Sequence, residues 1–171
     1  MRYKIFVEKI NSLLNNKEDL YNLGYSREFV EMIYSRFKIG FKKVNFSYNN
    51  ELLSLINNCD LSSFNIRELV FFDNTFTTQD AIFFGKYDDY PLGISRLSKE
   101  IIMFNQNNES IIMKVSTNAS AFLDALFVIA KYTSDGILKK EKPQISMIIE
   151  EATTLLGGYE YNSFCRLIFG V

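Results

Sequence analysis

The residues of this chain that could do chemistry are aspartates in a strand-rich region. They are Asp73, Asp80, Asp88 and Asp89. Asp88 and Asp89 are adjacent and lie between Tyr87 and Tyr90. Adjacent carboxylates on a loop between strands could hold a metal ion, act as an acid and base pair, or offer an acidic aromatic patch to a basic partner. Adjacent acids also follow from turn preference alone, so a solvated hairpin loop is the simplest interpretation and a partner surface the strongest functional one.

The chain has no histidine, which excludes several common catalytic and metal sites. Without an imidazole there is no Ser-His-Asp triad, no Cys-His dyad and no His-ligated zinc. The glycine-rich phosphate motifs G-x-G-x-x-G and G-x-x-x-x-G-K-[ST] are also missing from the sequence. We therefore expect no catalytic residue, no metal and no cofactor. A carboxylate-dependent hydrolase that uses the four aspartates is the enzymatic alternative.

Two cysteines, Cys59 and Cys165, lie far apart in the sequence, and no base is adjacent to either. A nucleophilic cysteine needs a nearby group that stabilises the thiolate. The interpretation we favour is a pair of buried, reduced thiols, since so sparse a pair is not typical of a secreted disulfide scaffold. This predicts a cytoplasmic protein.

Length and charge restrict the class of protein further. With 171 residues, of which 47% are hydrophobic and 23% charged, the chain can fill one core, so we expect a single domain over residues 1–171. Lys and Arg number 19 and Asp and Glu 20, a net charge of −1, which is unsuited to a binder of nucleic acid phosphates. The longest apolar run, residues 125–130, is far shorter than the roughly 20 residues that span a bilayer.

Helical periodicity predicts elements at both ends of the chain. Residues 3–14 carry an apolar stripe, and Ser26 and Asn50 are suited to cap two further helices, with Gly40 in a left-handed position after the first of these. A long helix follows a cap within residues 116–118. Another lies between Pro143, expected in its first turn, and Gly157. Residues 161–168 form a last short helix or, as the alternative, a terminal strand.

Short segments rich in Ile, Phe and Val occupy the middle of the chain. They are residues 69–72, 81–84, 92–97, 100–104 and 110–115. Because the connections between them are too short for parallel crossovers, we expect consecutive hairpins. We interpret residues 59–65 as a loop and the aromatic side chains mostly as core. The predicted fold is α+β, with a mostly antiparallel meander sheet wrapped by N- and C-terminal helices.

Several local patterns resemble those of the SUKH superfamily. They are AIFFG at 81–85, PLGI at 91–94, the strand pair that ends at Glu100-Ile101, and VSTN at 115–118 followed by Phe122-Leu123 and Leu126. Members of that superfamily typically show an apolar strand that ends in Phe-Gly, and a later strand that leads through small polar residues into a helix with Phe-Leu. The resemblance covers roughly residues 26–169. The Gly-Leu-Pro or Asn-Gly-Gly signals of many relatives are not clear here, and no tryptophan closes the C-terminal helix.

The resemblance implies a SUKH-like fold and a protein-binding role. Many bacterial members are immunity proteins that neutralise a cognate secreted toxin, often a nuclease or deaminase, and others are regulatory. The chain would then be a non-enzymatic binder of a protein partner, with no nucleic acid or membrane partner. A regulatory or structural role without a toxin, and a homodimer, stay open. We expect the contacts at Tyr87, Asp88, Asp89 and Tyr90, with the tyrosines as anchors and the carboxylates facing a basic surface.

Overall fold

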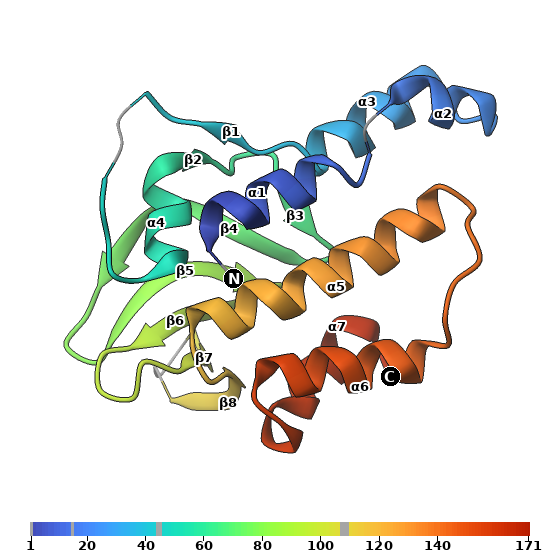
Figure 1. Cartoon of the computed structure of the whole chain (residues 1–171). Helices are drawn as coiled ribbons and strands as arrows, with labels where there is room; N and C mark the ends of the chain where they lie inside the picture. Colours follow the sequence, from blue (N-terminus) through green and yellow to red (C-terminus); the bar gives the residue numbers. More distant parts are fainter. Residues whose placement is uncertain (1, 15, 44–45, 107–109) are drawn as a thin grey trace.

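A computed structural model describes residues 2–14, 16–43, 46–106 and 110–171 of the chain and has an α+β architecture (Figure 1). The main sheet has six strands in the order of the sequence, and each pairs antiparallel with its neighbour. They are β3 (Asn65–Ile66), β4 (Leu69–Thr77), β5 (Ala81–Tyr87), β6 (Tyr90–Ser95), β7 (Ile101–Phe104) and β8 (Ile111–Ser116). The predicted meander, with helices at both ends of the chain, is confirmed.

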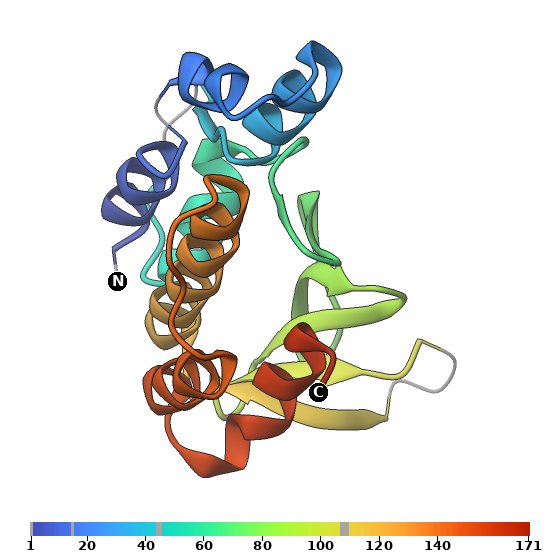
Figure 2. The same cartoon turned by 90° about the vertical axis from the view of Figure 1, so that its right-hand side faces the viewer.

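Helices cover one side of this sheet, as Figure 2 shows for α1, α4 and α5. The helices are α1 (Tyr3–Asn11), α2 (Lys17–Asn22), α3 (Arg27–Arg36), α4 (Glu51–Asn58), α5 (Ala119–Ile137), α6 (Ile145–Leu156) and α7 (Asn162–Phe169), with a 3-10 turn at Tyr159–Tyr161. Within the described part of the chain, no helix is both long and apolar enough to cross a membrane.

The main core lies between the sheet and these helices. Phe84 of β5 meets Phe122 of α5 edge to face with ring centroids 5.8 Å apart, and Phe122 in turn packs against Phe164 of α7. All three rings are fully buried. The predicted caps are confirmed: Ser26 and Asn50 accept amide hydrogen bonds at the starts of α3 and α4, and Asn118 accepts one from Ala121 at the start of α5. Sheet and helices therefore share one continuous core.

Three local predictions are wrong, and one helix was not predicted. Residues 59–65 are not only a loop, because β2 (Cys59–Asp60) pairs with β1 (Gly40–Phe41), and β3 begins at Asn65. Gly40 therefore lies in a strand instead of the left-handed position after α3. Pro143 precedes the cap of α6 and is not in its first turn. The short helix α2 was not predicted. Strands of two residues and a helix of six residues leave too little periodicity to be recognised.

Strands β4 and β5 approach closely at one glycine. Gly85 of β5 pairs with Phe71 of β4 next to an irregularity in the β5 to β6 register. A Cβ atom at Gly85 would lie 2.5 Å from the carbonyl oxygen of Val70, which belongs to the backbone and cannot rotate away. The close approach therefore requires glycine.

Replacing Gly85 by alanine should lower the free energy of unfolding by about 1–3 kcal/mol, because the backbone of β4 must move away from the added methyl group. Gly40→Ala is the matched control: it is also a strand glycine, and the nearest atom to its added Cβ is 3.8 Å away. Urea denaturation followed by circular dichroism measures both variants. Equal stabilities would contradict the close approach.

Candidate functional site

The face of the sheet turned away from the helices carries a second apolar cluster. Ala81, Phe83, Ile102 and Phe104 are buried there, separately from the main core, and Phe72 packs against them. Their strand neighbours Ile101, Met103 and Phe84 belong to the main core, as the alternation of side chains along a strand requires. An antiparallel sheet with one solvated face normally places polar residues on that face. This outer face departs from the rule.

Four phenylalanine rings on the outer face form a continuous row, which we call the aromatic row: Phe72, Phe76, Phe83 and Phe104. Phe76 lies 5.8 Å from Phe72 and stacks on Phe83 at 4.7 Å, and Phe83 meets Phe104 edge to face at 5.0 Å, all between ring centroids. Phe76 is 50% exposed. The ring contacts hold the row in place, while Phe76 presents apolar surface to solvent.

A pocket of about 400 Å³ opens beside the row, and we call it the aromatic pocket. The four rings line it together with Lys86, Asp89, Pro91, Asn105 and Gln106. The apolar rings come from β4, β5 and β7, whereas Asp89 comes from the connection between β5 and β6. The pocket therefore joins the aromatic row to the acidic hairpin that the sequence singled out.

Asp88 and Asp89 form the turn of this hairpin, between the paired residues Tyr87 and Tyr90. Asp88 has φ 53°, a left-handed conformation that aspartate tolerates better than most residues, and its N–H donates to the Glu68 carbonyl at 3.1 Å. Lys86 Nζ lies 3.6 Å from Asp89 Oδ1, with the Lys86 side chain partly exposed and that of Asp89 largely exposed. An exposed pair of this length contributes little, so Asp89 can change partner at low cost.

Tyr87 is not available as the contact that the sequence predicted. Its side chain is 8% exposed and its hydroxyl donates to the Leu167 carbonyl of α7 at 3.1 Å. Its ring also meets Phe164 edge to face, and burial is the main cause that raises the pKa of its phenol. Tyr87 therefore fastens α7 to the sheet. Asp88, Asp89 and Tyr90 are exposed, so the rest of the predicted contact set faces solvent.

The aromatic row was missed because its rings were assigned to the core. The sequence does contain a signal for it in the pairs Phe71-Phe72 and Phe83-Phe84. Successive side chains of a strand point to opposite faces, so each pair must place one ring on each face of the sheet. Since helices cover one face, one ring of each pair, Phe72 in the first and Phe83 in the second, lies on the other face.

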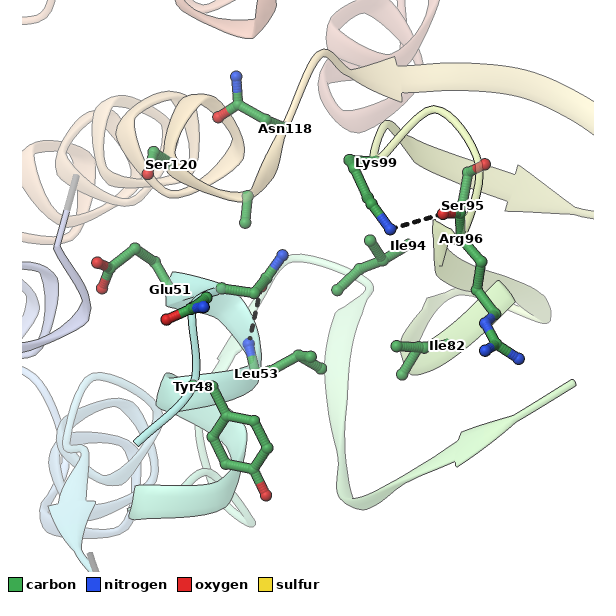
Figure 3. Close-up of a pocket in the computed structure, with 13 residues that line it drawn as sticks. Tyr48, Glu51, Leu53, Ile82, Ile94, Ser95, Arg96, Lys99, Asn118 and Ser120 are labelled. Carbon is green, nitrogen blue, oxygen red and sulfur yellow. Dashed lines mark hydrogen bonds between the residues drawn. The ribbon is translucent and has the colours of Figure 1, made fainter. Parts of the chain in front are cut away.

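A larger cleft of about 720 Å³ lies elsewhere, between the first turns of α4 and α5 and the C-terminal end of β6 (Figure 3). Its charged side chains are engaged by the chain itself. Glu51 Oε2 accepts from the Tyr3 amide at 2.9 Å, Lys99 Nζ donates to the Arg96 carbonyl at 2.6 Å, and Arg96 Nη1 donates to the Thr78 carbonyl. The amides at the two helix starts are capped by Asn50 and Asn118. The cleft therefore presents mostly satisfied polar groups.

The other candidate residues do not gather at one place. In the part of the chain that the structure describes, no three carboxylate or thiol side chains come together as metal ligands. Cys59 and Cys165 are buried free thiols. Burial raises the pKa of Cys59 to about 11, which keeps this thiol protonated at neutral pH.

No protein-family model, curated protein or solved structure matches the chain. The SUKH likeness therefore stays a prediction from the pattern of residues.

Replacing Tyr87 by phenylalanine should lower the free energy of unfolding at neutral pH by about 0.5–1.5 kcal/mol, because the Leu167 carbonyl loses the hydroxyl donor and retains the Gly170 N–H. Folding raises the pKa of this phenol above its usual value near 10. The stability that the neutral hydroxyl contributes is therefore fully present below about pH 10 and is lost as the pH rises through the raised pKa of the folded state. Urea titrations should show that the difference in free energy of unfolding between the unchanged chain and Tyr87→Phe is smaller at alkaline than at neutral pH. Tyr90→Phe, at an exposed tyrosine, is the control, and an equal loss there would contradict this role of Tyr87.

Proposed function

We propose that this chain is a non-enzymatic protein-binding module that captures another protein on the outer face of its sheet. The observation that carries the proposal is the aromatic row, which lies on an uncovered sheet face with Phe76 half exposed. Contiguous exposed apolar surface on a soluble domain is typical of interaction sites. Aromatic side chains at the centre of such a surface commonly supply most of the binding energy.

The packing of the rings within the row favours tight binding. Phe83 and Phe104 are nearly buried, and each is packed against another ring of the row, so little side-chain freedom is left to lose when a partner arrives. Sites whose side chains are already ordered retain more of their contact energy as affinity. The row is therefore suited to act as a preorganised anchor.

The hairpin supplies the polar rim that such an anchor needs. The turn that joins β5 to β6 exposes Asp88, Asp89 and Tyr90. Asp89 also lines the aromatic pocket. Acidic side chains at a rim accelerate encounter with a basic partner and discriminate against an acidic one. The preferred partner of this surface is a protein with a basic patch.

The SUKH resemblance supports a more specific role as an immunity protein. In that role the chain would bind a secreted toxin domain in the cytoplasm and block it without chemistry of its own. A regulatory or structural protein could use the same surface on another partner. The genes next to this one separate these roles, because an adjacent secreted toxin favours immunity, whereas an operon of metabolic or wall-assembly enzymes favours regulation.

Capture of the partner should depend on the row. Phe76→Ser should weaken binding by about thirtyfold, the effect of losing an anchor worth ~2 kcal/mol. The matched control is Leu97→Ser, which removes a side chain that is 95% exposed on the connection between β6 and β7. A tagged chain is expressed in the native cell, co-purified proteins are quantified for each variant, and the partner's affinity is then measured with purified proteins. If both variants weaken binding equally, or if neither weakens it, the row does not belong to the interface.

Charge reversal of the hairpin should act on the rate of association. The double variant Asp88→Lys and Asp89→Lys should slow binding of a basic partner about tenfold at low salt, with a smaller effect as salt rises. The same charge change at Glu150 and Glu151 on α6, which are exposed and lie on a different element, is the control. Stopped-flow or surface-based kinetics measure both. Unchanged kinetics and an unchanged salt dependence would exclude the hairpin as a contact.

A further inference from the structure

We infer that the aromatic pocket is the receptor for a single arginine side chain of the protein partner. This inference rests on the proposed function and specifies which group of the partner the same surface takes. The pocket's volume of about 400 Å³ is at the small end of the roughly 300–1,000 Å³ typical of ligand sites. It therefore suits one long side chain better than a helix or strand of the partner.

The rings of the row offer a surface that attracts cations. The face of an aromatic ring carries partial negative charge, and a cation within about 6 Å of its centre is bound electrostatically. Elsewhere the chain covers its own rings in this way, with Lys9 over Phe127 at 5.0 Å and Lys142 over Tyr132 at 4.9 Å from nitrogen to ring centroid. Among the described residues, no such contact involves the aromatic row. Phe83 and Phe104 are only 4% and 7% exposed, so the ring surface that is left for a cation from outside is mainly that of Phe76, which is 50% exposed.

The rim of the pocket supplies acceptors at the edge of the rings. Asp89 brings a carboxylate and Gln106 a side-chain carbonyl oxygen. A guanidinium is flat and carries five donors in a fixed fork, so it can lie against a ring and donate to a carboxylate at the same time. An ammonium is a strongly hydrated point charge and cannot stack in this way. The combination of rings and carboxylate favours arginine over lysine.

Lys86 is the chain's own competitor for Asp89. Its ammonium lies 3.6 Å from Asp89 Oδ1, and the Lys86 and Asp89 side chains are 43% and 80% exposed. A pair of this kind is weak, whereas a guanidinium that donates two hydrogen bonds to one carboxylate makes a stronger contact. An incoming arginine can therefore displace Lys86. An apolar side chain in the pocket would instead strip water from Asp89 without offering it a donor.

The test is a titration of the full chain with N-acetyl-arginine amide, followed by NMR amide shifts. N-acetyl-lysine amide and N-acetyl-leucine amide are the comparison probes. We expect the arginine probe to shift residues around Phe76, Phe83 and Asp89, and to bind about three- to tenfold more tightly than the leucine probe, the range that a cation over a ring provides. It should also bind more tightly than the lysine probe, because a guanidinium can lie flat on a ring and donate to a carboxylate at the same time. The shifts should weaken with added salt.

Four variants separate the contributions. Phe76→Leu keeps apolar bulk but removes a ring, and Asp89→Asn keeps size but removes charge, so each should weaken the arginine probe about threefold or more. Lys86→Gln should strengthen it because the competing cation is gone. Glu150→Gln on α6 is the control for a remote charge change and should have no effect.

Binding of the leucine probe as tight as that of the arginine probe would overturn the inference. So would an unchanged affinity in Asp89→Asn, shifts confined to the cleft between α4 and α5, or no shift with the arginine probe. These outcomes do not by themselves contradict the proposed function. If Phe76→Ser still abolishes capture of the partner while the arginine probe does not bind, the sheet face is the interface and the arginine receptor is wrong.

Discussion

The alternation of side chains along the strands is the constraint on which the rest of this structure depends. Paired phenylalanines in β4 and β5 must send one ring to each face of the sheet, whatever packs around it. On the inner face, Phe71 and Phe84 join the core formed with α1, α4 and α5. On the outer face, Phe72 and Phe83 contact other rings instead of a helix. A single strand pattern therefore produces both a core and an open aromatic surface.

The hairpin between β5 and β6 joins the buried core to the aromatic row on the outer face. Tyr87 points inward and ties its hydroxyl to α7, whereas Asp89 lies at the rim of the aromatic pocket. The inward contact holds the β5 end of the hairpin against α7, and Asp88 and Asp89 follow directly in the turn. A binding surface held by the core in this way needs little rearrangement when a partner arrives.

The candidate site was only half visible in the sequence. Adjacent acids between two tyrosines mark a hairpin turn, and the structure places Asp88, Asp89 and Tyr90 on its exposed side. The burial of Tyr87 depends on α7, which is separated from it by 80 residues of chain, and no local pattern reports such a contact. The aromatic row had a local signal in its phenylalanine pairs, but which face stays uncovered is decided by where the helices pack.

The sequence by itself determined the elements whose signals are local: the capped helices α3, α4 and α5, the meander with its short connections, and the apolar stripe of α1. Caps, turns and periodicity act within a few residues, so they can be read in order along the chain. The tertiary structure alone decided the pairing of β1 with β2, the inward turn of Tyr87, and the assembly of the aromatic pocket from β4, β5, β7 and the hairpin. Each of these depends on contacts between segments far apart in the chain, and these are settled by competition for burial as the whole domain folds.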